Sequence, residues 1–260
     1  MSVTFEFDGL KYAKASTHQK EWGNRLIDGL DFKGCERILD LGCGDGVLTA
    51  RLAELVPRGF VLGLDSSQGM IETARKHERD NLRFELADIG RISFAQEFDL
   101  VFSNAALHWI KDHRSLLAKT YRSLREDGTV RFNFAADGNC ANFFEVVRKV
   151  MALEEYTKDF ASFDWPWYMP RIDTYEALVG QFPFKESRVW GENADRNFPD
   201  AEALVGWVDQ PSLVPFLKYI AAERKKSFRE AVVQRMLEAT RQADDTFFET
   251  FRRVNLFARK

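Results

Sequence analysis

A buried strand that runs into a glycine-rich turn is the feature that most constrains how this chain folds. Residues 38–41 read Ile-Leu-Asp-Leu, and glycines follow at positions 42, 44 and 46. Residues 47–55 then have the apolar spacing of a helix. Glycine permits positive φ angles and close approach of the backbone to a ligand, and a helix N-terminus offers free N–H groups. The stretch therefore predicts a strand, a tight turn and a helix that together hold a cofactor.

The glycine spacing and two acids indicate which kind of cofactor this turn holds. The dinucleotide fingerprint is G-x-G-x-x-G, whereas this chain has G-x-G-x-G followed by Val47. Asp40 precedes the glycines and Asp45 lies within the turn, where carboxylates repel a pyrophosphate but pair well with an ammonium group. S-adenosylmethionine carries a positively charged amine and sulfonium, so it fits this turn better than a dinucleotide does.

Two further acids follow the next two expected strands. The strand over 60–65 ends at Asp65, about 20 residues beyond the glycines, which is the offset at which a carboxylate binds ribose hydroxyls. The strand over 82–86 is followed by Asp88, whose carboxylate can accept a hydrogen bond from an adenine amino group. All three acids thus lie at the carboxyl ends of strands, where ligands of parallel sheets bind.

Together these motifs resemble the class I S-adenosylmethionine-dependent methyltransferases. The resemblance implies that Asp40 contacts the methionine amine, Asp65 the ribose and Asp88 the adenine, with S-adenosylhomocysteine as the product. It also implies an N-terminal lid over residues 12–19 in which a Tyr and a Gln flank the cofactor. The cofactor contacts predicted in this way are Tyr12, Gln19, Asp40, Gly42, Cys43, Gly44, Asp65, Ser66, Met70, Asp88, Ile89 and Asn104.

The alternation of strand and helix patterns from residue 37 to residue 135 predicts a parallel sheet with right-handed crossovers. Strands are expected over 37–41, 60–65, 82–86, 98–103, 129–135, 184–190 and 247–258, and helices over 12–30, 47–55, 67–76, 113–124 and 142–156. Further helical patterns cover 199–208, 212–222 and 228–240. We therefore expect an α/β, Rossmann-like class I methyltransferase fold. Its seven-stranded sheet is mostly parallel with an antiparallel last strand, and a helical cap is inserted between strands six and seven.

This organisation divides the chain into six expected segments. They are an N-terminal lid helix (1–30), a cofactor-binding α/β core (31–141), a helix with an aromatic cap loop (142–182), the sixth core strand (183–192), the inserted helical cap (193–245) and the last core strand (246–260).

The stretch after the fourth strand, Ser-Asn-Ala-Ala-Leu-His-Trp at 103–109, bears on the methyl acceptor. It lacks the Asn/Asp-Pro-Pro-aromatic motif of amino-group methyltransferases, and no cysteine follows a proline as in cytosine C5 methyltransferases. It resembles trans-aconitate, malonyl-carrier-protein and juvenile hormone acid methyltransferases, which make methyl esters of carboxylic acids. His108 and Trp109 are therefore predicted at the reaction site. The predicted substrate contacts are Trp165, Tyr168, Arg171 and Trp207.

The nature of the acceptor decides which side chains the reaction needs. A carboxylate is ionised at neutral pH and needs no general base, whereas a phenol or amine needs one, and His108 is the best-placed histidine. A carboxylate also calls for a cationic partner, and the candidates are Arg171, Arg188, Arg252 and Arg253. Three alternatives stay open: another small-molecule or carrier-bound acceptor (phenol, amine or acyl chain), a non-catalytic S-adenosylmethionine-binding protein, and a nicotinamide reductase.

Composition limits the partners and the compartment. The formal net charge of −3 over 260 residues lacks the basic footprint of nucleic-acid binders. The three cysteines show no C-x-x-C pair and no His/Cys ligand spacing, which predicts reduced thiols and no metal. The N-terminus has no signal-peptide pattern, and no apolar run approaches the length of a membrane span. We expect a cytoplasmic monomer or weak homodimer that acts on a small molecule and binds neither nucleic acid nor membrane.

Overall fold

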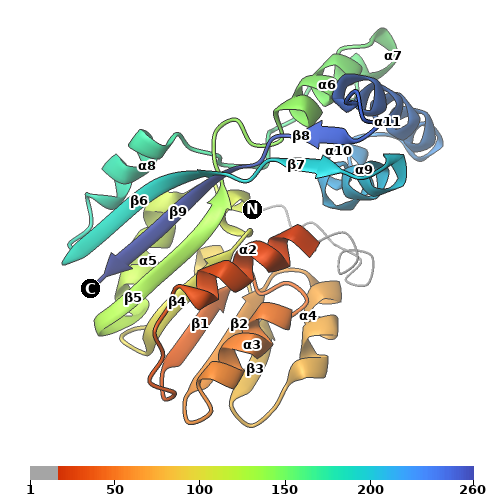
Figure 1. The fold of residues 1–260 in the computed structure, drawn as a ribbon. Coiled ribbons are helices and arrows are strands. Elements are labelled where there is room, and N and C mark those ends of the chain that lie inside the picture. The colour runs from red at the N-terminus through yellow and green to blue at the C-terminus, as the bar shows by residue number, and fades with distance from the viewer. Residues whose placement is uncertain (1–16) are drawn as a thin grey trace. The chain divides into compact units, whose positions relative to one another are not determined.

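The computed structural model of the chain describes residues 17–260, which form two compact units (Figure 1). The first unit contains the described chain up to Asp137 together with Trp167–Glu192 and Arg253–Lys260. The second contains Gly138–Pro166 and Asn193–Arg252.

The first unit is built on a seven-stranded sheet. In spatial order the strands are β3 (Leu82–Leu86), β2 (Phe60–Asp65), β1 (Arg37–Leu41), β4 (Phe98–Asn104), β5 (Leu124–Ala135), β9 (Arg252–Arg259) and β6 (Glu186–Asn193). The strands from β3 to β5 are parallel to their neighbours, and β9 is antiparallel to β5. The predicted α/β fold, with its mostly parallel sheet and antiparallel last strand, is therefore confirmed. The strand order reverses at β1 and β4, which is the switch point where such sheets bind ligands.

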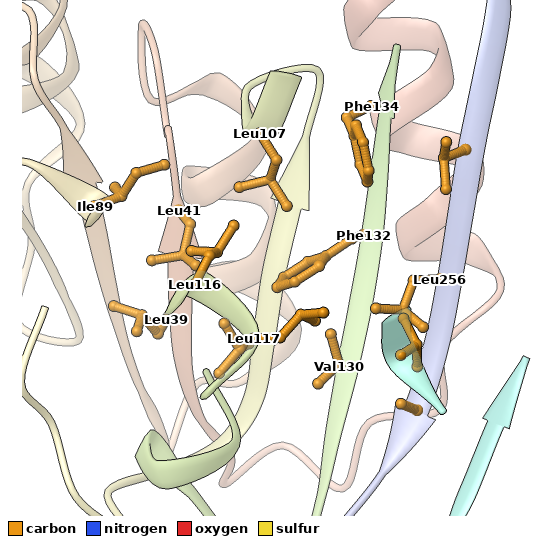
Figure 2. Packing of buried hydrophobic residues seen from close by; sticks show 14 of the residues in the cluster. Leu39, Leu41, Ile89, Leu107, Leu116, Leu117, Val130, Phe132, Phe134 and Leu256 are labelled. Atoms are coloured by element: carbon orange, nitrogen blue, oxygen red, sulfur yellow. The ribbon is translucent and has the colours of Figure 1, made fainter. Parts of the chain in front are cut away.

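Helices cover both faces of this sheet because its strands are apolar on both sides. On one face, Ile38 of β1 packs in a cluster with residues of α2 (Thr17–Asp28), α3 (Val47–Leu55) and α4 (Gln68–Ala74). Successive side chains of a strand point to opposite faces, so Leu39 and Leu41 pack on the other face with α5 (His113–Ser123) and α8 (Ile172–Val179). Figure 2 shows this second cluster, with Leu116 and Leu117 of α5 beside Leu39 and Leu41.

Three short 3-10 turns occur in this unit, and the two that follow strands lie at the carboxyl edge of the sheet. The three turns are η1 (Arg75–His77) after α4, η2 (Ile89–Arg91) after β3 and η3 (Leu107–Trp109) after β4. The last two replace a direct passage from strand to helix and present the residues predicted to contact the ligand.

The second unit is helical and carries a small two-stranded sheet. Its elements are α6 (Ala141–Met151), α7 (Glu154–Thr157), β7 (Arg196–Phe198), α9 (Ala201–Trp207), the π-helical turn η4 (Val208–Ser212), α10 (Val214–Leu217), η5 (Ala222–Arg224), α11 (Lys225–Thr240) and β8 (Phe247–Glu249). Aromatic side chains fill its interior, and Phe143, Phe216 and Phe228 are fully buried. The helices expected between the sixth and seventh strands are thus present, whereas their role as a cap stays a prediction.

Several details differ from the sequence-based expectation. The helix expected over 142–156 is two helices, α6 and α7. The single strand expected over 247–258 is two strands: β8 pairs with β7 in the second unit, and β9 pairs with β5 in the first. The break falls at Thr250 and Phe251, whose polar atoms bond within the second unit; Thr250 Oγ1 donates to Gly138 O (3.0 Å) and Phe251 N donates to Asp195 Oδ1 (2.9 Å). Helix α8 also had no predicted counterpart, because the two prolines before it obscured its apolar spacing.

A buried carboxylate at this break anchors the start of α6. Glu249 accepts hydrogen bonds from the backbone N–H groups of Asn142 (3.2 Å), Phe143 (2.8 Å) and Thr250 (2.7 Å), and its burial raises its pKa. Two of these donors belong to the first turn of α6, which has no intrahelical acceptors. Cys140, the residue before the helix, makes no side-chain cap hydrogen bond.

We expect Glu249→Ala to lower the free energy of unfolding of the protein by about 3 kcal/mol, because it leaves buried donors without acceptors. Urea denaturation followed by tryptophan fluorescence measures this loss. Glu249→Gln keeps one acceptor oxygen and should give an intermediate loss. Equal stability of Glu249→Ala and the wild type would contradict the capping role.

Candidate active site

A pocket opens in the first unit at the carboxyl edge of β1 and β4. Its lining residues come from α2, the end of β1, the glycine turn, the start of α3 and the end of β4. They are Lys20, Asp40, Gly42, Cys43, Gly44, Asp45, Leu48, Phe102, Asn104 and Ala105. The structure thus brings five of the predicted cofactor residues together: Asp40, Gly42, Cys43, Gly44 and Asn104.

The glycine turn is held by the neighbouring strand and needs glycine for two different reasons. The backbone N–H groups of Gly42 and Cys43 donate to Leu64 O at the end of β2 (2.8 and 2.9 Å). Gly42 has a φ of +76°, and a Cβ there would lie 2.2 Å from the Cβ of Ala106. Gly44 has a φ of +55°, and a Cβ there would meet no atom within 4 Å. Gly42 therefore permits close packing of the turn on the loop after β4, whereas Gly44 leaves space in the pocket.

Asp40 is a buried acid with a strongly perturbed titration. Its side chain is 2% exposed and accepts a hydrogen bond from Thr49 Oγ1 (2.7 Å) in α3. Burial, with a smaller effect of the charge of Asp65, raises the pKa of Asp40 to about 7, although the hydrogen bond from Thr49 opposes the rise. A buried carboxylate of this kind gains from a positively charged ligand group, because that charge favours its ionised form. The site therefore fits an ammonium group.

Lys20 supplies a positive charge at the same pocket. Its Nζ lies 2.8 Å from Asp45 Oδ2 in the glycine turn. Sequence reasoning missed this residue. Its helical spacing could have indicated it, because Lys20 lies on the same face of α2 as Gly23 and Asn24. Gly23 packs against Leu48, and Asn24 accepts a hydrogen bond from Arg51 of α3.

Asp65 and its neighbours lie at the end of β2, next to the turn. The two carboxylate oxygens of Asp65 accept hydrogen bonds from the N–H groups of Gly44 (3.0 Å) and Ser67 (2.9 Å). Ser67 caps α4 through its contact with Met70 N (3.5 Å). Met70 is buried and Ser66 is exposed. Asp65 therefore links the glycine turn to the start of α4.

Asp88 and Ile89 lie farther along the edge, after β3. Asp88 Oδ1 accepts from Gly90 N (2.8 Å) and caps η2, while Oδ2 lies 3.4 Å from Arg91 Nε. Ile89 is buried in the core beneath. Neither residue lines the pocket. Tyr12 lies outside the described residues, and Gln19 is described only as part of the backbone of α2.

The predicted reaction-site residues His108 and Trp109 lie in η3, three residues beyond the pocket-lining Ala105. The Trp109 ring lies 5.3 Å from that of Trp167, and His108 O accepts a hydrogen bond from Tyr168 N (2.8 Å). His108 Nδ1 is buried and has no hydrogen-bond partner among residues 17–260. Burial, with smaller effects of Arg253 and His113, lowers the pKa of His108 to about 3. His108 is therefore neutral at pH 7 and a weak base.

A second buried histidine fixes the position of η3. His113 Nε2 lies 3.0 Å from Leu107 O, which can only accept, so Nε2 carries the proton and Nδ1 accepts from the Tyr175 hydroxyl (3.2 Å). The Tyr168 ring lies 4.5 Å from the ring of His113. This arrangement connects η3, α5 and α8 through a neutral imidazole.

The burial of His113 makes the stability of the protein depend on pH. Its pKa is lowered to about 4 by burial, below the ordinary value of 6.5, so the unfolded state binds more protons between these two pH values. The contribution of His113 to the free energy of unfolding should therefore fall by roughly 1–3 kcal/mol as the pH drops from 7 to 4.5. Urea denaturation across this range should show that the free energy of unfolding depends less steeply on pH in His113→Gln than in His77→Gln, which replaces an exposed histidine. Equal slopes would contradict this explanation.

The four predicted substrate contacts are divided between the units. Tyr168 and Arg171 belong to the first unit, and Trp165 and Trp207 to the second. Arg171 is exposed and pairs with Asp173 at 2.9 Å. Trp207 is 3% exposed and packs on Phe143, so its burial is that of a core residue and gives its predicted contact no support.

Comparisons with known proteins show to which family this chain belongs. Residues 38–128 match the family model of a methyltransferase domain. The chain is also 34% identical to a trans-aconitate 2-methyltransferase of Deinococcus radiodurans over 184 residues, which are 70% of each chain. The chain belongs to the class I S-adenosylmethionine-dependent methyltransferases. The cofactor of this methyltransferase is S-adenosylmethionine, whose ammonium group matches the acidic pocket.

Two further similarities extend the comparison. The methyltransferase is 38% identical over 136 residues to a malonyl-[acyl-carrier protein] O-methyltransferase of Acetivibrio thermocellus, which is 51% of this chain and 48% of that protein. The crystal structure of the YcgJ protein of Bacillus subtilis has the same fold, with a TM-score of 0.65, 15% identity, and coverage of 93% of this chain and 98% of that one. Over residues 17–260, no helix of the methyltransferase is both long and apolar enough to span a bilayer.

Proposed function

We propose that this methyltransferase transfers the methyl group to a carboxylate of a small molecule and so forms a methyl ester. The observation that carries the proposal is the burial of His108, whose Nδ1 has no hydrogen-bond partner among residues 17–260 and whose pKa is lowered to about 3. A phenol or amine acceptor needs a base whose pKa lies near the working pH, which His108 does not provide. A carboxylate needs none. The names of the Deinococcus and Acetivibrio proteins support the same acceptor chemistry.

The proposal assigns the pocket residues to parts of the cofactor. Asp40 binds the ammonium group, and Lys20 is suited to the carboxylate of the methionine moiety. Asp65 binds the ribose hydroxyls and Asp88 the adenine amino group. Gly44 lets the backbone approach the cofactor, because no atom lies within 4 Å of the position of its missing Cβ.

The chemistry of the transfer follows from the charges of the two reactants. S-adenosylmethionine supplies a methyl group on a positively charged sulfur: the carboxylate oxygen forms the O–CH₃ bond as the S–CH₃ bond breaks, and the electron pair stays on sulfur. No proton is released. The protein then contributes alignment and exclusion of water, which reach roughly 7–11 kcal/mol for a well-oriented pair. The Trp109 and Trp167 rings supply apolar surface next to His108 for this purpose.

A methyl-transfer screen with radiolabelled S-adenosylmethionine tests the proposal. The acceptors are trans-aconitate, other carboxylic acids, a malonyl group on a carrier protein, phenols and amines. We expect labelled product from at least one carboxylate, and mild alkali should release the label as methanol because the product is an ester. Alkali-stable product from a phenol or amine, with no ester from any acid, would refute the proposal.

The pH dependence of the rate gives a second check. With both substrates saturating, kcat for a carboxylate should stay flat from pH 6.5 to 9, because the acceptor is already ionised and no base titrates. An amine or phenol acceptor would instead give a rate that rises with pH across this range.

The carrier-bound acyl group is the second candidate acceptor, because the chain is 38% identical to the Acetivibrio protein over the matched residues and 34% identical to the Deinococcus protein. The same screen separates the two cases. Ester formed on the carrier-bound malonyl group, and on no free acid, favours this candidate.

A further inference from the structure

A buried arginine lies at the start of β9, in the first unit. Arg253 is 4% exposed, and its Nη2 and Nε both donate to Asn133 Oδ1 (2.6 and 2.8 Å). Its guanidinium lies 4.5 Å from the centre of the Trp22 ring of α2. Burying a guanidinium is costly, so its hydrogen bonds and its ring contact fix it in one orientation.

A network of amide side chains supports this orientation. Asn133 Nδ2 donates to Asn255 Oδ1 (3.0 Å), which also accepts from Arg131 Nη2 (3.2 Å). Asn255 Nδ2 in turn donates to Glu192 (3.2 Å). The Asn133 side chain is thereby oriented so that its oxygen faces Arg253. The plane of the Arg253 guanidinium is fixed as a result.

Strand register places Arg253 on the same sheet face as the cofactor pocket. Asn104, which lines the pocket, pairs with Asn133, and Asn133 pairs with Asn255. Side chains of directly paired residues lie on one face. Arg253 is two residues from Asn255, so it shares this face, and it pairs with Ala135 at the carboxyl end of β5. The guanidinium is therefore nearer the ligand-binding edge than Asn133 is.

The other candidate cations for an acceptor carboxylate have different surroundings. Arg171 is exposed and pairs with Asp173, and Arg252 pairs with Asp195 in the second unit. Arg188 is exposed beside the Trp190 ring. Of the four arginines, Arg253 alone combines burial with a place on the pocket face.

His108 lies within electrostatic reach of this arginine. His108 lies in η3, which follows the pocket-lining Asn104 and Ala105 at the end of β4, and the charge of Arg253 contributes to its lowered pKa. His108 Nδ1 is buried and has no hydrogen-bond partner within the described part of the chain. A buried ring nitrogen of this kind gains from a polar ligand.

We propose that Arg253 binds the carboxylate of the methyl acceptor, with His108 Nδ1–H as a second donor to the same group. This inference rests on the proposed function. Holding one carboxylate oxygen leaves the other free to attack the methyl carbon. The acceptor loses its negative charge as the ester forms, so the ion pair is stronger with the substrate than with the transition state. Arg253 therefore contributes mainly to acceptor affinity, and its loss raises KM more than it lowers kcat.

Kinetics of Arg253→Gln and Arg253→Lys test this role. The acceptor is the acid from which the wild type makes most ester in the screen, and trans-aconitate is tried first. We expect KM for the acid to rise roughly 10- to 100-fold in Arg253→Gln, as for a lost hydrogen bond between charged groups. Arg253→Lys keeps the charge and should recover part of the affinity. The Kd for S-adenosylhomocysteine should stay within about threefold of the wild type, since Asp40 and the glycine turn are intact. Arg259→Gln is the matched control, because it removes an exposed guanidinium from the opposite end of β9, where Arg259 pairs with Thr129, so its KM should be unchanged.

A measurement on the unchanged protein covers the case in which the Arg253 variants fail to fold. The side-chain Nε–H resonance of Arg253 should shift on addition of trans-aconitate together with S-adenosylhomocysteine, and should stay in place with the trimethyl ester. If the wild type makes ester but Arg253→Gln keeps its KM, or if the resonance does not move, Arg253 is not the anchor and the proposed function stands. If the wild type makes no ester from any acid, both proposals fail.

Discussion

Replacing Asp40 with asparagine is expected to abolish cofactor binding and, at the same time, to stabilise the cofactor-free protein. The binding loss follows from removal of the buried carboxylate that the pocket offers to an ammonium group at the end of β1. Removing one partner of a buried, hydrogen-bonded charge pair costs roughly 2–5 kcal/mol, so Kd for S-adenosylhomocysteine should rise at least about 30-fold.

The gain in stability follows from the raised pKa of Asp40, which is about 7 in the folded protein and 3.8 ordinarily. Between these two pH values Asp40 binds more protons in the folded state than in the unfolded state, so its contribution to stability falls as the pH rises from 4 to 7. Asparagine is neutral and avoids this loss. At pH 8, Asp40→Asn should be roughly 1–3 kcal/mol more stable than the wild type without cofactor.

Calorimetry with S-adenosylhomocysteine and urea denaturation at pH 6 and pH 8 measure the two effects. Thr49→Val is the informative control, because it keeps the charge of Asp40 but removes the hydrogen bond that favours the ionised form. It should bind S-adenosylhomocysteine weakly at pH 7 and approach the wild type at pH 9. Binding by Asp40→Asn within threefold of the wild type would show that another group holds the ammonium.

Much of the fold was predictable because local patterns decide it. Strands β1, β2 and β3 and helix α3 begin and end at the predicted residues, since apolar runs bounded by glycines and acids leave few alternatives. The long strand expected after residue 246 was not predictable in detail. Residues 247–258 are uniformly β-prone, and only tertiary contacts of Thr250 and Phe251 divide them between the two units.

The candidate site divides in the same way. Asp40 and the glycines follow from spacing, because the end of a strand and the turn after it are fixed by a few residues. Lys20 and Arg253 do not follow from spacing. Lys20 belongs to a helix that precedes the sheet, and Arg253 belongs to the antiparallel last strand. Among four arginines, sequence alone could not distinguish Arg253 from the exposed Arg171, since burial depends on the packing of α2 over the sheet.

The titration states also arise from packing. His108 appears in the sequence as a possible base, yet its burial in η3 makes it neutral and weakly basic. That finding supports the acceptor already favoured from the sequence, a group that is ionised at neutral pH. The same burial makes a polar ligand at His108 Nδ1 favourable, so one structural fact bears on both the chemistry and the recognition of the acceptor.

Two alanine substitutions in the glycine turn should separate folding from cofactor binding. Gly42→Ala places a Cβ 2.2 Å from Ala106 Cβ at a φ of +76°, so the turn and the loop that carries η3 must move apart. We expect a loss of about 2–5 kcal/mol in the free energy of unfolding, as for a strained and overpacked site, and little activity from what folds.

Gly44→Ala should behave in the opposite way. Its φ of +55° costs an alanine about 1–2 kcal/mol, but its Cβ meets no atom within 4 Å, so the protein should fold. The methyl group instead projects into space that the cofactor is proposed to occupy, and Kd for S-adenosylhomocysteine should rise roughly 10- to 100-fold, equivalent to about 1.4–2.8 kcal/mol. Urea denaturation and calorimetry on both variants give the comparison. If Gly44→Ala binds S-adenosylhomocysteine as tightly as the wild type does, the cofactor does not approach the backbone at this glycine, and the assignment of the pocket must change. If Gly42→Ala is instead as stable as Gly44→Ala, the contact with Ala106 does not hold the loop that positions His108.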